Sequence, residues 1–152
     1  MIIRLDDLQG PEIRLLLEEH LRGMRALSPP CSVHALDLDA LRRPEISFWT
    51  VWDEHALAGC GALKALDEQH GEIKSMRTAA SHLRRGVARL MLAHIEATAR
   101  GRGYAQLSLE TGSSSGFEAA HRLYESFGFE VCGPFGDYGE DPHSSFMTKR
   151  LG

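Results

Sequence analysis

The segment from residue 84 to residue 89 (RRGVAR) combines residue types that can bind a phosphate group, and it lies between an expected strand and an expected helix. The first turn of a helix exposes backbone N–H groups without intrahelical partners and carries the positive end of the helix dipole. Gly86 and Ala88 would let a diphosphate approach this backbone closely, and three arginines add positive charge. The segment therefore predicts an anion site at the start of a helix.

Taken alone, this turn is also typical of an ordinary exposed helix start with surface arginines. It has neither the Lys-Ser/Thr pair of a nucleotide P-loop nor the three glycines of a dinucleotide-binding turn. A nucleotide-binding protein is therefore the weaker interpretation of a phosphate site here. Lys74 and Arg77 lie on the expected strand that leads into the turn and add positive charge to a chain of formal net charge −4.

Hydrophobic periodicity predicts the elements that would position this turn. Before it we expect a strand at 1–5, helices at 11–27 and 36–43, and strands at 46–52, 56–64 and 71–78. After it we expect a helix from 87 that ends at Gly101, a strand at 105–110, a helix at 117–127 and strands at 129–132 and 146–151. This order predicts a mixed α/β sheet with helices on its faces.

Length and composition limit the class of protein. The 152 residues, 43% hydrophobic and 25% charged, predict a single globular domain over 1–152. The acidic net charge does not favour nucleic-acid binding. The three cysteines form no CxxC pair and no His/Cys/Asp cluster has metal spacing, so we expect neither a disulfide nor a metal. His20 and His94 lie on apolar helix faces and are expected to be core or boundary residues.

Other sequence signals concern the location of the protein. No apolar run approaches the length that spans a bilayer, and residues 1–7 lack the hydrophobic stretch of a signal peptide. We therefore expect a cytoplasmic protein that does not bind a membrane.

Two motifs in the same order along the chain resemble the GNAT superfamily of acetyltransferases. The family's Gln/Arg-x-x-Gly-x-Gly/Ala turn reads LRRGVA at 83–88, and its Ala-x-x-Leu-Tyr-x-x-x-Gly-Phe motif is matched at every fixed position by AHRLYESFGF at 120–129. The resemblance extends from about Ile46 to the C-terminus, and segments 108–112 and 134–142 resemble a branch of small stand-alone bacterial N-acetyltransferases. Leu83 replaces the usual Gln or Arg, and Phe117 replaces a frequent Asn, so each position loses a polar contact.

The resemblance implies a mostly antiparallel sheet of six or seven strands with helices on both faces. It also implies a splayed parallel pair, 71–78 and 105–110, with the pantetheine arm of the co-substrate acetyl-CoA in the gap. The implied cofactor-binding residues lie on the first of these strands and in the turn. They are Met76, Arg77, Thr78, Arg84, Arg85, Gly86, Val87, Ala88 and Arg89.

The implied reaction is direct transfer of an acetyl group to a primary amine of a small molecule or a peptide. Near pH 7 only about one part in a thousand of such an amine is neutral, so the site must remove a proton. The resemblance implies that Tyr124 is the general acid toward the departing sulfur. Its alternative role is that of a core tyrosine on the inward face of its helix.

Three side chains are candidates for the general base. Glu72 and Glu110 lie on the strands expected to flank the acceptor, and we rank them equally ahead of His70. Each carboxylate is about as well explained as an ordinary solvated or salt-bridged strand residue.

The loop 134–142 is expected either to form an acceptor wall or to be an exposed turn. In the first case Asp137, Glu140 and Asp141 would attract a cationic acceptor. The resemblance also implies a homodimer. The main alternative to the enzyme is a non-catalytic acyl-CoA-binding module that senses the ligand or regulates a partner.

Overall fold

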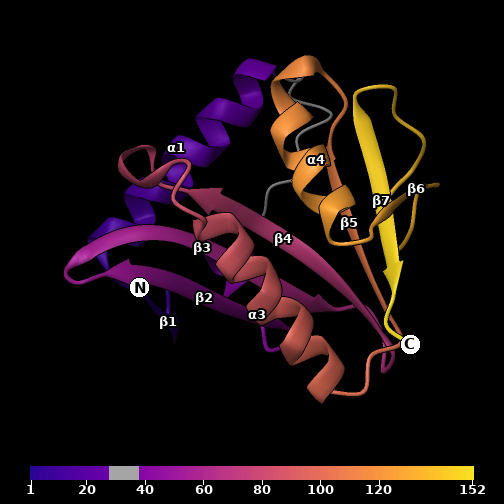
Figure 1. Cartoon of the computed structure of the whole chain (residues 1–152), viewed down its shortest axis with the longest axis horizontal. Coiled ribbons are helices and arrows are strands. Elements are labelled where there is room, and N and C mark those ends of the chain that lie inside the picture. Colours follow the sequence, from indigo (N-terminus) through magenta and orange to yellow (C-terminus); the bar gives the residue numbers. More distant parts are fainter. Residues whose placement is uncertain (28–37) are drawn as a thin grey trace.

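The computed structural model describes residues 1–27 and 38–152 (Figure 1). The strands in chain order are β1 (Ile2–Leu5), β2 (Ile46–Asp53), β3 (Ala56–Ala65), β4 (His70–Thr78), β5 (Gln106–Gly112), β6 (Glu130–Cys132) and β7 (Ser144–Arg150). The α-helices are α1 (Pro11–Leu27), α2 (Leu38–Leu41), α3 (Val87–Gly101) and α4 (Glu118–Ser126), with short 3₁₀ turns at Ala80–His82 and Ser115–Phe117.

The described strands form a seven-stranded sheet in the order β1-β2-β3-β4-β5-β7-β6. Neighbouring strands are antiparallel except β4 and β5, which run parallel. A parallel connection needs a crossover, and α3 provides it between these two strands. The predicted fold class, a mixed and mostly antiparallel sheet with one parallel pair, is confirmed.

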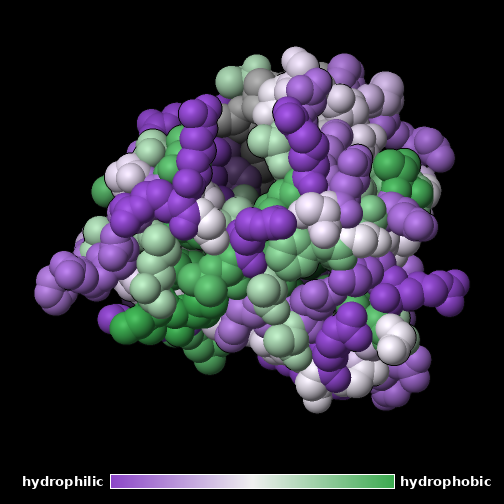
Figure 2. Space-filling view, viewed as in Figure 1, coloured by the Kyte–Doolittle hydropathy of each residue, from purple (hydrophilic) through white to green (hydrophobic). Residues whose placement is uncertain are grey.

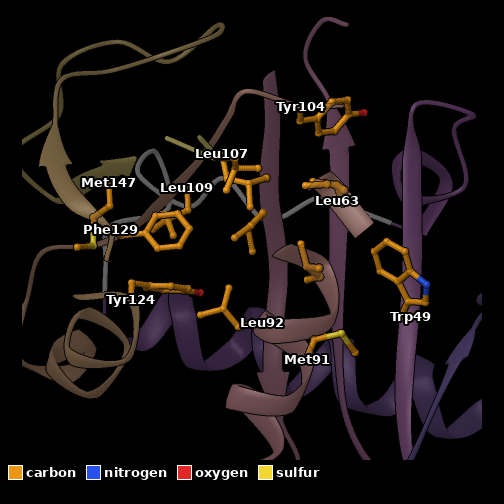
Figure 3. Packing of buried hydrophobic residues seen from close by; sticks show 14 of the residues in the cluster. Trp49, Leu63, Met91, Leu92, Tyr104, Leu107, Leu109, Tyr124, Phe129 and Met147 are labelled. Carbon is orange, nitrogen blue, oxygen red and sulfur yellow. The ribbon is translucent and has the colours of Figure 1, made fainter. Parts of the chain in front are cut away.

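Helices cover both faces of this sheet. On one face α3 and α4 pack over a large core in which Met91, Leu92 and Tyr124 lie with strand residues such as Leu109 (Figure 3). On the other face α1 and α2 bury a smaller cluster that includes Ile13. In Figure 1, α3 crosses in front of the sheet while α1 lies behind it. The alternation of side chains along each strand supplies both cores.

The parallel pair is joined over only four positions. Its register runs from His70↔Gln106 to Ile73↔Leu109, yet β4 continues to Thr78 and β5 to Gly112. The ends of the two strands therefore diverge beyond Ile73 and Leu109. Backbone groups that face each other across such a gap can pair with an extended ligand instead of with the neighbouring strand.

A β-bulge lies in β4 directly after this divergence. The pairing with β3 goes from Ala62↔Lys74 to Cys60↔Arg77, so the chain advances three residues along β4 while it advances two along β3. Ser75 within the bulge has φ 56°, in the left-handed region. An extra residue in one strand reverses the side-chain alternation that follows it. The bulge therefore brings Arg77 to the same face as Glu72 and Lys74, although its number is odd.

The structure adjusts three predicted boundaries. The helix predicted at 117–127 begins with a separate 3₁₀ turn, in which the Phe117 N–H donates to the Ser114 carbonyl at 3.0 Å, and α4 proper starts at Glu118. The helix predicted at 36–43 is described only as α2, Leu38–Leu41, and residues 36–37 lie outside the described ranges. The strand predicted to end at Glu110 continues to Gly112 because β7 pairs with it up to Ser144.

Gly59 allows the start of α3 to lie close against the sheet. A Cβ at this position would be 2.7 Å from the Arg77 carbonyl oxygen and 2.7 Å from Val87 Cγ1. Backbone cannot move aside easily, so we expect Gly59→Ala to cost about 1–3 kcal/mol by overpacking. That corresponds to a Tm decrease of about 2–4 °C per kcal/mol, measurable by calorimetry.

Gly133→Ala is the matched control, because nothing lies within 4 Å of a Cβ placed there. An unchanged Tm for Gly59→Ala would contradict this account of the α3 contact.

Candidate active site

A cavity of about 440 Å³ lies where β4 and β5 diverge, and its walls come from α1, β4, β5 and α4. The space-filling view shows a recess between α1 and α4, rimmed by hydrophilic residues (Figure 2). The ionisable side chains that line the cavity are His20, Glu72, Lys74, Arg77, Glu110, Tyr124 and Tyr138. This volume is within the range of small-molecule pockets.

The turn at the start of α3 has the features expected of an anion site. Gly86 is the N-cap residue with φ 81°, and no side chain caps the helix there. The first backbone N–H groups of α3 have no intrahelical acceptor. Among the described residues, nothing beyond its chain neighbours lies within 4 Å of a Cβ built on Gly86. The helix start therefore presents uncapped amides to open space, which is the arrangement that binds anions at helix N-termini.

Two of the three arginines in the turn have partners on the protein. Arg85 Nη2 lies 3.4 Å from Asp53 Oδ2 at the end of β2. Arg89 Nη1 donates to Ser126 Oγ at 3.0 Å, which ties α3 to the end of α4. Arg84 is exposed and has φ 62°. These contacts position the turn, and they leave the start of α3 without a side-chain cap.

A buried histidine anchors the approach to this turn. His82 is 5% exposed, and its Nε2 lies 3.1 Å from the Asp53 carboxylate that also pairs with Arg85. Its Nδ1 lies 2.7 Å from Ser81 Oγ. This anchor could not be predicted from the sequence, because nothing in the spacing of Asp53 and His82 indicates that they meet.

Tyr124 lies at the junction of the core and the cavity. It is 6% exposed, and its ring packs edge-on against Phe129 with 5.8 Å between centroids. In Figure 3 its hydroxyl points away from Phe129 toward the side of Leu92. Burial raises the pKa of Tyr124 above its usual value near 10. The hydroxyl is therefore protonated at neutral pH and can donate a hydrogen bond into the cavity.

Glu72, Lys74 and Tyr138 form a hydrogen-bonded trio at the other end of the cavity. Lys74 Nζ donates to Glu72 Oε2 at 3.0 Å and to Tyr138 Oη at 2.8 Å, and Tyr138 Oη donates to the same Glu72 oxygen at 2.6 Å. Glu72 is 2% exposed, so its charge depends on these two donors. Burial and the nearby charge of Glu72 raise the pKa of Tyr138, with a smaller contribution from Glu110.

The other two predicted bases occupy different positions. Glu110 lines the cavity and is only partly buried, at the level where β5 leaves β4. His70 is not among the cavity-lining residues; its Nε2 lies 2.7 Å from Ser108 Oγ, which in turn lies 2.9 Å from Thr148 Oγ1. The structure thus brings Glu72 and Glu110 to one cavity and holds His70 in a separate polar network.

The loop after β6 contributes one aromatic ring, that of Tyr138, to the cavity lining and none of its acids. Phe135 and Tyr138 stack edge-on at 5.2 Å, and both contact the ring of Phe146 on β7. Asp137 and Glu140, in contrast, are exposed and absent from the cavity lining. The sequence predicted a role for this loop but none for Tyr138, because its contact with Glu72 spans 66 positions of the chain.

The predicted contacts on β4 face both sides of the sheet. The Met76 sulfur and Met91 both lie next to Gly61, so Met76 faces α3, and Thr78 pairs with Gly59 on that same face. The Arg77 side chain instead points to the α1 side. Lys74, expected to add charge near the turn, is bound to Glu72.

His20 was expected to be an ordinary core or boundary histidine. It is half-buried on α1 and lines the cavity. Burial, and secondarily the positive charge of Arg77, lower its pKa to about 4. No signal in the sequence separates this histidine from the apolar helix face around it.

The sequence and the fold match known proteins. The model of the acetyltransferase (GNAT) family matches residues 13–129, and the chain belongs to this family. It is 62% identical over 151 residues to the uncharacterized N-acetyltransferase YsnE of Bacillus subtilis, covering 99% of this chain and 100% of that protein. It is 39% identical to an IAA acetyltransferase of Azospirillum brasilense, covering 99% and 97%.

Solved structures share the fold. A chain described as an acyl-CoA N-acyltransferase from Klebsiella pneumoniae superposes with a TM-score of 0.78 at 26% identity, covering 99% of this chain and 97% of that one. A GNAT family acetyltransferase from Elizabethkingia anophelis with acetyl-CoA bound gives 0.68 at 18% identity, covering 99% and 97%. The predicted family and the predicted acetyl-CoA-dependent N-acetyltransferase are confirmed. In the described residues, no helix is both long and apolar enough to cross a bilayer.

Gly86→Val tests the diphosphate site, because the new side chain would occupy the open space before the α3 amides. We expect the Kd for coenzyme A, measured by calorimetry, to rise about tenfold or more, as backbone approach to the ligand is blocked. Gly103→Val is the matched control. Gly103 has the same φ of 81° and the same open surroundings, but it lies at the opposite end of α3.

Both variants carry the strain of a branched residue in the left-handed region, so both should lose stability. Equal effects of the two variants on the Kd would show that strain, and not the site, accounts for the loss.

Proposed function

We propose that the protein transfers the acetyl group of acetyl-CoA directly to a primary amine of a small molecule. The observation that carries this proposal is the cavity at the divergence of β4 and β5, which joins Tyr124 on one wall with Glu110 on another. A hydroxyl donor and a carboxylate acceptor facing one space are the two groups that acyl transfer to an amine requires.

When bound, acetyl-CoA supplies a thioester whose carbonyl carbon the neutral amine attacks. The chain's own residues support this reaction in several ways. The amides of the turn at Gly86 hold the diphosphate, and the unpaired backbone beyond Ile73 aligns the pantetheine arm. Tyr124 keeps its proton on Oη because burial raises its pKa, so that it donates a hydrogen bond where negative charge develops on the leaving sulfur.

Glu110 is our candidate for the base that takes the proton of the ammonium group. Both hydrogen bonds given to Glu72 converge on Oε2, and this buried carboxylate neutralises Lys74. If Glu72 took up a proton as the base, the buried ammonium group of Lys74 would lose its counter-charge. Glu110 is more accessible and faces the same cavity. We therefore assign Glu72 to positioning and Glu110 to proton removal, directly or through water.

The names of the relatives do not point to one acceptor. One relative is an IAA acetyltransferase, one structural neighbour is an aminoglycoside 6'-N-acetyltransferase complexed with coenzyme A, and another is a ribosomal-protein-S18-alanine N-acetyltransferase. We infer a small-molecule amine from the cavity, whose volume of about 440 Å³ suits a compact acceptor and whose lining includes the carboxylates of Glu72 and Glu110.

The test is an assay of free thiol released from acetyl-CoA across polyamines, amino acids, aminoglycosides and peptides. We expect turnover on at least one class of small amine. Tyr124→Phe should lower kcat by about tenfold or more while Tm and the Kd for coenzyme A change little, because only the donor is lost. Tyr104→Phe is the control, since this tyrosine is buried in the same core but does not line the cavity.

Binding of coenzyme A without thiol release on any amine would contradict the proposed transfer. An unchanged kcat in Tyr124→Phe would remove this hydroxyl from the reaction.

Glu110→Gln should lower kcat about 100-fold near pH 7, because the amine then loses its proton without help. The loss should shrink as pH rises, since the neutral fraction of an amine grows tenfold per pH unit up to its pKa near 10.4. The measurement is a kcat profile from pH 6 to 10. Glu72→Gln is the comparison, and its main effect should be a lower Tm from the unpaired Lys74.

A deficit in Glu110→Gln that stays constant with pH would mean that this carboxylate has another role.

A further inference from the structure

We propose that Arg77 and His20 form a subsite for a carboxylate, so that the acceptor is a small molecule with both a primary amine and a carboxylate. This inference rests on the proposed function, because it places the acceptor's amine beside Glu110 in the same cavity. It adds a charged group at the other end of the acceptor, and it makes amino acids the substrate class.

The bulge in β4 places Arg77 on the acceptor side of the sheet. Arg77 is opposite Cys60 on β3, and Lys74 is opposite Ala62, which shares with Cys60 the core cluster under α1. Paired residues of neighbouring strands point to the same face. Arg77 therefore lies on the face of Lys74 and away from α3, whose start holds the diphosphate site.

The Arg77 guanidinium has an unused hydrogen-bond donor. Within the part of the chain that the structure describes, its Nε is buried and has no hydrogen-bond partner. Lys74, the other cation lining the cavity, is already bound to Glu72 and Tyr138. A buried donor on a charged group is unfavourable without an acceptor. A guanidinium matches the two oxygens of a carboxylate.

His20 on α1 completes the subsite from the opposite wall. It lines the cavity, and it is close enough to Arg77 for that charge to contribute to its lowered pKa. An imidazole with a pKa of about 4 is neutral at pH 7. A neutral imidazole can donate one hydrogen bond to a carboxylate without adding a repulsive charge next to Arg77.

The spacing of the two ends suits a molecule of amino-acid size. Continuing the β4–β5 register one step brings Glu110 to the level of Lys74. On the β3 register Arg77 lies two residues beyond Lys74, which is about 7 Å along the strand. The side chains of Glu110 and Arg77 can therefore contact the two ends of one compact zwitterion, the amine and the carboxylate. The cavity thus offers an acidic end to the amine and a cationic end to the carboxylate.

The test compares each acceptor with its own amide. The kcat and KM are measured with acetyl-CoA for α-amino acids and their amides, and for β-alanine and 4-aminobutyrate with theirs. We expect kcat/KM to be about tenfold or more higher for the acid, mainly through KM. In Arg77→Gln this ratio should fall toward one, and Arg77→Lys should retain part of it. Arg122→Gln, on the exposed face of α4, is the control that should keep the full ratio.

Three results would overturn the subsite. They are equal kcat/KM for acids and amides in the unaltered protein, a preference that survives in Arg77→Gln, and a raised Kd for coenzyme A in Arg77→Gln, which would assign the guanidinium to the co-substrate.

A binding experiment separates this inference from the proposed function. If no amine is acetylated, the proposed function fails. The subsite can still be tested by calorimetry, which measures the Kd of N-acetyl amino acids and of N-acetyl amino acid amides in the presence of coenzyme A. Tighter binding of the acids, lost in Arg77→Gln, would support the subsite. Equal binding would refute it.

Discussion

Backbone pairing between β4 and β5 stops at Ile73 and Leu109, and the whole site is arranged around the gap that results. A parallel pair normally satisfies its N–H and C=O groups along its full length. Here the bulge at Ser75 turns the end of β4 away, so these groups face a cavity instead of a strand. The helix that crosses between the two strands starts beside the same gap. One break in the sheet therefore brings unpaired strand backbone, the approach to the start of α3 and the walls that carry Tyr124 and Glu110 to one cavity.

Some charged groups of the cavity pair with each other and hold its wall in place, whereas others are left to contact a substrate. The buried Glu72–Lys74 pair is held by Tyr138 from a distant loop, and its two opposite charges offset each other. Removing either partner from such a pair is much more costly than never forming it. The trio therefore acts as a fixed wall. In the proposed reaction the reacting groups are Glu110 and the hydroxyl of Tyr124. The cation Arg77 lies on the α1 side of the sheet, as the trio does.

The sequence was sufficient for the family and for most of the fold. The turn at Gly86 and the motif around Tyr124 could be recognised because both are local patterns, in which residues a few positions apart determine the backbone conformation. The acceptor end was harder to predict. Tyr138 meets Glu72 across 66 positions, and the face on which Arg77 lies depends on one extra residue in β4. Neither the distant contact nor the bulge leaves a pattern in residue types. The cavity position of His20 was missed for a similar reason, since an apolar helix face has the same sequence pattern beside a core and beside a cavity.

The bulge also determines what a change in the length of β4 would do to the structure. Met76 and Arg77 are neighbours in the chain, yet Met76 faces the hydrophobic core under α3 and Arg77 faces the cavity on the α1 side of the sheet. Removing Ser75 would restore strict alternation between Lys74 and Arg77, because Met76 would then lie opposite Gly61 and Arg77 would stay opposite Cys60. Both side chains would keep their present faces, but the left-handed backbone at Ser75 would be lost. The extra residue thus matters for the path of β4 where it leaves β5, whereas the face of each side chain is set by its partner on β3.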